Sequence, residues 1–304
     1  FKFAVSLFKG AKGRKLSSIE AHDLCCKIAQ IVVVGGVRRS ALISLSNLTD
    51  DRIRRSKHGN WWETEPQRGL ANNSACYTEK PDFEAFMSEW SSLYESRSGE
   101  RGFFSRVASQ NQAAKNGRRD AGHDFGTNPC SEIILRPQQF CNLSEVVVRH
   151  DDTFDTLKSK VRLASILGTL QATLTDFRYL RKKWQDNTAE EALLGVSLTG
   201  ILDNKRMATV GPKLAGELEE LKNEAVRVNK DWAKRLGINQ STAITCVKPS
   251  GTVSQLVNSA SGIHGRFADY YIRRVRADSR DPLCTVLEAA GVPVEDDVTS
   301  SSTK

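Results

Sequence analysis

The sequence predicts an α/β fold, because stretches with apolar residues at helical spacing alternate with short runs rich in β-branched residues. The two longest helices are expected at 157–174 and 214–232, where apolar residues recur every three or four positions. Gly237 is expected to end the second helix, and the run 243–247 after it predicts a buried strand. The 304 residues suffice for one large domain or two ordinary ones.

The N-terminal segment predicts a helix, a glycine loop and a strand, in that order. Ser17 stands three residues before Glu20, which is the spacing of a capping box, and apolar residues follow at helical spacing as far as Val32. The pair Gly35–Gly36 is expected to form the loop that ends this helix. Small polar and apolar residues alternate over 40–46, as they do in a strand.

A further helix is expected after Pro81–Asp82, and its apolar stripe is expected to face the core. The stripe consists of Phe83, Phe86, Met87, Trp90, Leu93 and Tyr94. Farther along, 131–135 and 141–148 are expected to be extended, with Arg136–Pro137 in their connection.

The composition excludes several classes of protein. The longest apolar run, Ile31–Val34, is far shorter than the roughly 20 residues that span a bilayer, so we expect no membrane segment. The seven cysteines are odd in number and form no Cys-x-x-Cys pair, which argues against a disulfide framework and against structural zinc. We therefore expect no metal site, and a reducing compartment, the cytoplasm.

The chain begins at Phe1, with no initiator Met and no signal peptide, and we expect it to be an internal piece of a longer protein. Its net charge of +8 favours polyanionic partners such as nucleotides. The densest basic stretch, 52–58, is followed by Trp61–Trp62 and is compatible with a nucleic-acid contact. A solvated loop is the simpler interpretation of this stretch.

The segment Thr127–Leu135 has the clearest chemical potential. Alternate side chains of an extended chain share a face, so Asn128, Cys130 and Glu132 are expected to point the same way, with Pro129 stiffening the segment. Together an amide, a thiol and a carboxylate can bind hydroxyl groups, accept a proton and supply a nucleophilic or radical sulfur. This combination suits a polyhydroxylated substrate. A strand edge with a buried cysteine is the alternative that spacing leaves open.

A second thiol, that of Cys141, follows in the next extended run. If the chain folds back at Arg136–Pro137, antiparallel pairing sets Glu132 opposite Cys141. The second thiol is then expected to return to the same site.

A small-residue turn after the predicted strand 243–247 is rich in hydroxyl groups. It offers free backbone N–H groups and a helix start to an anion, which favours phosphate binding, although a simple capped helix start explains it equally well. The turn consists of Pro249, Ser250, Gly251, Thr252, Val253 and Ser254.

Three motifs in this order resemble the catalytic subunit of ribonucleotide reductase. They are Asn-Pro-Cys-Ser-Glu at 128–132, Phe-Cys-Asn-Leu at 140–143 and Pro-Ser-Gly-Thr-Val-Ser at 249–254. Within that family the chain is most similar to the adenosylcobalamin-dependent (class II) ribonucleoside-triphosphate reductases. That closer likeness is carried by 35–41, 168–175, 177–180 and 271–274. The likeness covers nearly the whole chain.

The resemblance implies a ten-stranded α/β barrel with a central finger loop, of which 1–304 would form one part, truncated at both ends. It implies that homolysis of the cofactor's carbon–cobalt bond leads to a thiyl radical on Cys130, which abstracts the ribose 3′-hydrogen. Glu132 would accept the 3′-hydroxyl proton, and Asn128 would hold the ribose hydroxyls. Cys141 would be one of two cysteines that supply electrons, the other lying outside this chain.

The resemblance also implies binding partners. The segment Pro249–Ser254 would bind the phosphates of a ribonucleoside triphosphate, and adenosylcobalamin would be the cofactor. A thioredoxin-like protein or dithiol would supply electrons, and neither nucleic acid nor a membrane would be bound. The loop that relays the identity of a deoxynucleotide effector would comprise Gly35, Gly36, Val37, Arg38, Arg39 and Ser40.

Two alternatives remain at this point. The large subunit of a diiron-dependent ribonucleoside-diphosphate reductase would have the same barrel and a different radical source. Tyr270–Tyr271 is similar to its tyrosine relay, but the pair lies just before Arg273–Arg274, in a segment that is structural in the family. A basic nucleic-acid-binding module around Arg52–Lys57 is the less favoured alternative.

Overall fold

The computed structural model describes residues 1–34, 37–38, 40–297 and 303–304, and the chain divides into two compact units. Unit 1 comprises Phe1–Ser105 and Ile272–Lys304, and unit 2 comprises Arg106–Tyr271. Among the described residues, no helix has the length and apolar character needed to cross a membrane. The expectation that 1–304 belongs to a single barrel domain stays a prediction.

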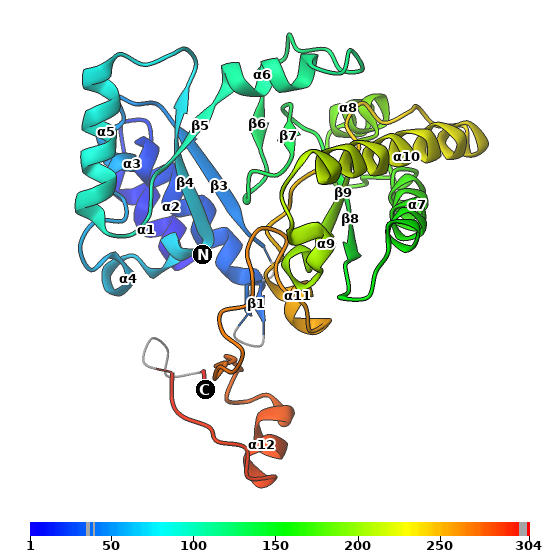
Figure 1. Ribbon diagram of the computed structural model, residues 1–304. Coiled ribbons are helices and arrows are strands. Elements are labelled where there is room, and N and C mark those ends of the chain that lie inside the picture. The colour runs from blue at the N-terminus through cyan, green and yellow to red at the C-terminus, as the bar shows by residue number, and fades with distance from the viewer. Residues whose placement is uncertain (35–36, 39, 298–302) are drawn as a thin grey trace. The chain divides into compact units, whose positions relative to one another are not determined.

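Unit 1 contains a parallel sheet in the order β3–β4–β5, with helical segments in both crossovers (Figure 1). Its strands are β1 (Val33–Val34), β2 (Val37–Arg38), β3 (Leu42–Ser46), β4 (Ala71–Tyr77) and β5 (Gly102–Ser105). Its helices are α1 (Lys2–Gly10), α2 (Ser18–Ala29), η1 (Gln30–Val32), α3 (Asp51–Arg54), α4 (Trp61–Thr64), η2 (Pro66–Leu70), α5 (Phe83–Ser96) and α12 (Pro282–Ala289).

The N-terminal predictions are largely confirmed. The Ser17 backbone N–H donates to Glu20 Oε2 at 2.8 Å and Glu20 N–H donates back to Ser17 Oγ at 3.4 Å, so the capping box starts α2 as predicted. The predicted strand begins two residues late, at Leu42. The predicted loop at Gly35–Gly36 lies outside the described residues.

Helix α5 begins after Asp82 as predicted, but the expected burial of its aromatic stripe is wrong. Phe83 and Tyr94 are 79% and 77% exposed, whereas the side chain of Glu89 on the same helix is buried. Glu89 is held there by Arg101, which donates to both carboxylate oxygens at 2.6 and 2.7 Å, and by Arg54 at 3.0 Å. The buried side of this helix thus carries a carboxylate from outside the predicted stripe, because a charge paired with two arginines can be buried.

Unit 2 is built around the parallel strands β8 and β9, which are joined through helices α7 and α8. Its strands are β6 (Gly126–Thr127), β7 (Ile134–Leu135), β8 (Asn142–Val147) and β9 (Leu194–Thr199). Its helices are α6 (Arg106–Ala114), α7 (Phe154–Gln171), α8 (Lys182–Glu191), η3 (Ile201–Asp203), α9 (Lys205–Ala208), α10 (Pro212–Leu236) and α11 (Thr252–Leu256).

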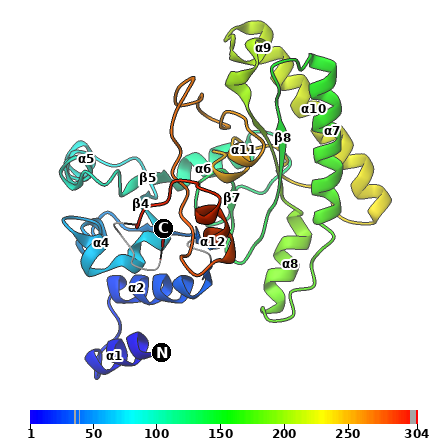
Figure 2. The same cartoon turned by 90° about the horizontal axis from the view of Figure 1, so that it is seen from below.

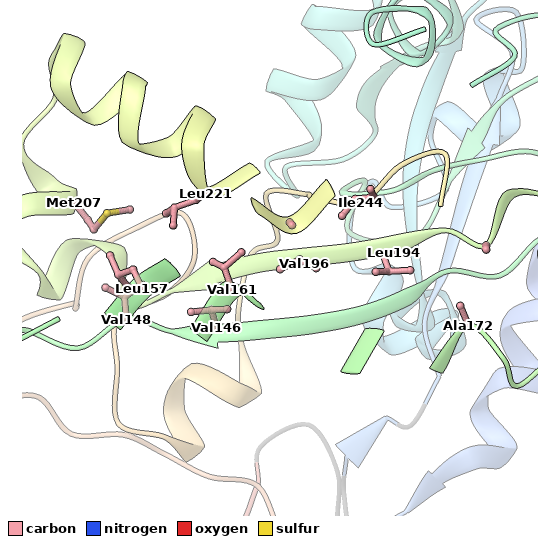
Figure 3. Packing of buried hydrophobic residues seen from close by; sticks show 12 residues of the cluster. Val146, Val148, Leu157, Val161, Ala172, Leu194, Val196, Met207, Leu221 and Ile244 are labelled. Carbon is pink, nitrogen blue, oxygen red and sulfur yellow. The ribbon is translucent and has the colours of Figure 1, made fainter. Parts of the chain in front are cut away.

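The core of unit 2 lies between the strand pair and its two long helices. Helix α7 packs on β8 and β9, and α10 packs on α7 (Figures 1 and 2). Figure 3 shows the buried side chains that meet there, among them Val146, Leu157, Val161, Leu194, Val196 and Leu221. Both long helices are therefore confirmed, and Gly237 ends α10 in the left-handed conformation, with φ of 69°.

The predicted strand 243–247 is only partly confirmed. Thr245 forms a single parallel bridge with Val196, and the backbone N–H groups of Val196 and Cys246 continue the pairing at 2.8 and 3.0 Å. The segment therefore lies alongside β9, on the side away from β8, and brings the residues after Cys246 toward the end of β9, where the Lys248 and Leu198 carbonyls both lie close to Gly262.

Candidate active site

The Asn-Pro-Cys-Ser-Glu motif forms a turn between β6 and β7, so the prediction that its alternate side chains share one face of a strand is wrong. Ser131 N–H donates to the Asn128 carbonyl at 2.9 Å, and Ser131 has a φ of 63°. Pro129 and Cys130 are the central turn residues, which is where Asn followed by Pro favours a reversal. Cys130 is exposed in this turn.

Asn128 fixes the shape of this turn. Its side-chain Oδ1 accepts the Ile133 backbone N–H at 3.0 Å. Its Nδ2 group has no partner in the part of the chain that the structure describes. The donating end of the amide therefore stays available to a ligand.

Glu132 is the most enclosed functional group of the motif. Its side chain is 0% exposed, and Oε1 accepts a hydrogen bond from Lys248 Nζ at 2.6 Å. The second oxygen, Oε2, is buried without a partner among the described residues. Burial by itself would lower the pKa of Lys248, but the hydrogen bond and charge of Glu132 outweigh it and raise that pKa.

Two half-buried thiols, those of Cys141 and Cys246, lie within electrostatic reach of Glu132. Burial, reinforced by the Glu132 charge, raises the pKa of Cys141 to about 11 and that of Cys246 to about 12. The positive charge of Lys248 opposes both shifts. The site therefore brings together a carboxylate, an ammonium group and two protonated thiols.

The predicted antiparallel register between Glu132 and Cys141 is wrong, although both residues reach the same site. Strand β7 pairs with β6, placing Thr127 opposite Ile134, and β8 pairs in parallel with β9. Cys141 lies in the site because it directly precedes β8. The first backbone N–H of that strand, from Asn142, donates to the Leu193 carbonyl at 2.9 Å.

One buried and one half-exposed ion pair hold the chain between β7 and β8 against helix α8, which explains why Arg136–Pro137 is not a hairpin turn. Arg119 donates to both carboxylate oxygens of Glu191 at 2.9 and 2.8 Å, and both side chains are nearly inaccessible. Arg136 pairs with Glu190. Gln139 donates to Glu191 and accepts the Arg136 backbone N–H at 3.1 Å.

Gly195 of β9 is the point where the separate segments of the site converge. A Cβ atom there would lie 2.4 Å from Leu143, 2.8 Å from Ile133 and 3.1 Å from Cys246 Sγ. The motif turn, β8 and the segment after α10 therefore all approach one strand position that has no side chain.

The segment Pro249–Ser254 leads into the short helix α11. Ser250 Oγ accepts the Ser254 backbone N–H at 3.0 Å, and Ser254 Oγ donates to the Ser250 carbonyl at 3.0 Å. Both side chains are buried, so these hydroxyls stabilise the turn itself. Gly251, Thr252 and Val253 are exposed.

The predicted effector loop belongs to unit 1. Gly35, Gly36 and Arg39 lie outside the described residues, and Val37–Arg38 forms β2, which pairs with β1. Ser40 Oγ donates to the Ala29 carbonyl at 3.4 Å.

Sequence reasoning missed two members of the site, Cys246 and Lys248. The sequence motifs gave neither residue a role. The available signal was their spacing, because residues two apart in an extended segment point to the same side.

This chain is similar to known proteins in both sequence and fold. No protein-family profile matches the chain. The adenosylcobalamin-dependent ribonucleoside-triphosphate reductase of Lactobacillus leichmannii is 29% identical over 96% of this chain and 42% of the relative. The enzyme of the same name from Levilactobacillus brevis is 30% identical over 98% of this chain and 42% of the relative.

Solved structures show the same fold. A B12-dependent (class II) ribonucleotide reductase matches 98% of this chain and 44% of its own, with 25% identity and a TM-score of 0.67. The class Id ribonucleotide reductase α subunit of Actinobacillus ureae matches 92% of this chain and 58% of its own, with a TM-score of 0.60. At 14% identity the second likeness concerns the fold alone.

The chain spans about two fifths of the length of the curated relatives that it matches. The parallel strands and flanking helices of both units are those of a fragment of the reductase barrel, which confirms the predicted fold class. From sequence and fold together, the chain is a homologue of the adenosylcobalamin-dependent (class II) ribonucleotide reductases.

Proposed function

We propose that this chain contributes the central catalytic residues of an enzyme that reduces ribonucleoside triphosphates to 2′-deoxyribonucleotides through a thiyl radical, supplying DNA synthesis in the cytoplasm. The observation that carries the proposal is the buried carboxylate of Glu132. One of its oxygens is held at 2.6 Å by Lys248, and the other has no partner among the described residues. Because a buried carboxylate oxygen seeks a hydrogen-bond donor, Oε2 suits a substrate hydroxyl.

The resemblance to the reductases suggests a role for each motif residue, and the chemistry of each residue suits that role. Glu132 accepts the proton of the ribose 3′-hydroxyl at Oε2 while hydrogen is abstracted from C3′. The free Nδ2 group of Asn128 donates to ribose hydroxyls. Cys130 carries the sulfur that abstracts the hydrogen atom, and its exposed position in the turn leaves that sulfur open to substrate.

Cys141 supplies electrons as one member of a thiol pair, while the 2′-hydroxyl leaves as water. The raised pKa of Cys141 suits this role, because its thiol keeps the proton that reduction of the substrate requires. A thioredoxin-like protein or a small dithiol then reduces the resulting disulfide.

Nucleotide binding involves two further segments. The exposed part of the turn, Gly251–Val253, is available to the substrate phosphates, with Pro249, Ser250 and Ser254 fixing its shape. The segment Gly35–Ser40 in unit 1 responds to a deoxynucleotide effector.

Adenosylcobalamin supplies an organic radical when it is bound. The exposed thiol of Cys130 fits that chemistry, because a radical source must reach this sulfur from outside the turn. No described side chain is assigned to the corrin ring.

Turnover by the full-length polypeptide that carries this chain tests the proposal. With ribonucleoside triphosphate, adenosylcobalamin and dithiothreitol, we expect chromatography to detect deoxynucleotide, and Cys130→Ser to abolish it. Cys25→Ser, which removes an exposed thiol of unit 1, serves as the matched control and should retain activity. Product formation by Cys130→Ser would contradict the proposal.

The same assay separates the two alternatives. Activity that needs no cobalamin but requires a second subunit favours a diiron-dependent reductase. The nucleic-acid-binding alternative has less support, because the basic stretch is largely paired internally. Lys57 is buried against Glu100 at 2.5 Å, and Arg54 binds Glu89.

A further inference from the structure

We propose that Lys248 is a positioning residue of this site: its ammonium group holds Oε1 of Glu132 so that the carboxylate stays ionised and presents Oε2 to the substrate. The inference rests on the proposed function, since it assigns Lys248 a part in the proton transfer that Glu132 performs. The two residues are 116 positions apart in the sequence, and the fold alone brings them together.

The first step of the argument is the burial of the carboxylate. A charged carboxylate removed from water is strongly disfavoured unless a counter-charge and hydrogen bonds compensate for the lost hydration. The side chain of Glu132 is 0% exposed, and within the described residues Lys248 is the only basic side chain that pairs with it. The ammonium group of Lys248 therefore supplies the counter-charge that this buried carboxylate needs.

The second step is the orientation of the carboxylate. Lys248 donates to Oε1 of Glu132 at 2.6 Å, which leaves Oε2 as the carboxylate oxygen without a partner among the described residues. A substrate hydroxyl is therefore offered one acceptor oxygen and not two. Because proton transfer requires the acceptor within hydrogen-bond reach of the donor, a fixed orientation is part of the function.

The third step is the rigidity of the segment that presents Lys248. A Cβ atom on Gly262 would lie 2.1 Å from the Lys248 carbonyl oxygen and 3.1 Å from that of Leu198, so the backbones pack directly on one another. Pro249 restricts the conformation of Lys248 from the other side. The ammonium group is therefore presented from a constrained backbone, and 24% of the side chain remains exposed.

The titratable groups around the pair are thiols. Cys141 and Cys246 lie within electrostatic reach of both charges, and Cys130 within reach of Lys248. Burial raises the pKa of Cys141 and of Cys246 to about 11 and about 12, so both stay neutral near pH 7. The carboxylate of Glu145 also lies within electrostatic reach of Cys246.

Kinetics of Lys248 variants in the full-length protein test the inference. Lys248→Met should lower kcat roughly 100-fold with little change in KM, because general-base catalysis contributes about that much or more. The acid limb of the pH profile of kcat should move up by about one to three pH units, because the lost counter-charge disfavours the ionised carboxylate. Lys248→Arg should restore most of kcat and the original limb.

Two kinetic outcomes would overturn the inference. An unchanged kcat in Lys248→Met would show that the carboxylate needs no counter-charge. A raised KM with unchanged kcat and an unchanged pH profile would show that Lys248 only binds phosphate.

A second measurement needs no turnover and uses the same full-length protein. Acylation of Lys248 by acetic anhydride at pH 9, followed by peptide mass spectrometry, should be slow, and Glu132→Gln should accelerate it several-fold. The reason is that Glu132 raises the pKa of Lys248, so its loss increases the fraction of free amine. Lys160, which pairs with Asp152 at 2.5 Å, provides the internal reference and should be unaffected.

The two measurements distinguish the possible failures. Equal acylation rates of Lys248 in the unmodified protein and in Glu132→Gln would show that the two side chains form no ion pair. That result would overturn the inference. If acylation reveals the pair but the full-length protein makes no deoxynucleotide, the proposed function fails and the positioning role fails with it. If the full-length protein makes deoxynucleotide and Lys248→Met has the same kcat and pH profile as the unmodified protein, only the positioning role of Lys248 fails.

Discussion

Three cysteines of unit 2 look alike in the sequence, yet their side chains have different surroundings. Cys130 is exposed in a turn, whereas Cys141 and Cys246 are half-buried beside a carboxylate. Alkylation proceeds through the thiolate, so burial and the neighbouring negative charge protect the second and third thiols. Burial first, and the charge of Glu132 second, raises the pKa of Cys141 and Cys246 and lowers the reactivity of their sulfurs.

Alkylation kinetics test this difference. At pH 8 iodoacetamide should modify the exposed Cys130 and Cys25 first, and Cys141 much later, because with a pKa of about 11 only about 1 in 1,000 of its molecules is thiolate. The Cys141 rate should rise about tenfold between pH 8 and pH 9, which peptide mass spectrometry can follow. Modification of Cys141 as fast as Cys25 would contradict the described burial.

Among the elements, β9 is the strand on which the site depends. It pairs with β8 on one side and with Thr245 on the other, and Gly195 leaves room for the motif turn above it. A strand glycine normally weakens a sheet, so its presence here is explained by the close approach of its neighbours.

Substitution of two glycines tests this dependence. Gly195→Ala should destabilise the protein by about 1–3 kcal/mol, because its methyl group overlaps Leu143 and Ile133. It should also speed alkylation of Cys246 by displacing it. Gly216→Ala, on the exposed side of α10 with nothing within 4 Å, should instead stabilise by up to about 1 kcal/mol. Thermal unfolding measures both, and equal effects would refute the packing argument.

At the scale of the whole molecule, the net charge of +8 does not identify the partner. The stretch 52–58 contributes four basic residues to that charge, but Lys57, Arg54 and Arg55 all pair with carboxylates of unit 1. This pairing neutralises the basic stretch locally, while the net charge of the chain, which already includes those carboxylates, is unchanged.

Nucleic-acid binding is therefore expected to be weak and nonspecific. Fluorescence anisotropy with a DNA duplex should give Kd values no tighter than about 10⁻⁶ M at physiological salt, the range of purely electrostatic binding. Arg52→Ala should change them little. Nanomolar binding that Arg52→Ala weakens would instead support the nucleic-acid module.

The sequence by itself determined the long helices and the three motifs, because capping boxes, apolar periodicity and helix-ending glycines act over a few neighbouring residues. Tertiary structure decided that β8 pairs with β9, that the aromatic stripe of α5 is exposed, and that Lys248 meets Glu132. These features depend on contacts between residues far apart in the chain, where local propensity carries no information. The sequence therefore showed which residue types could carry out the chemistry. The packing of distant segments decided how those residues are arranged in space.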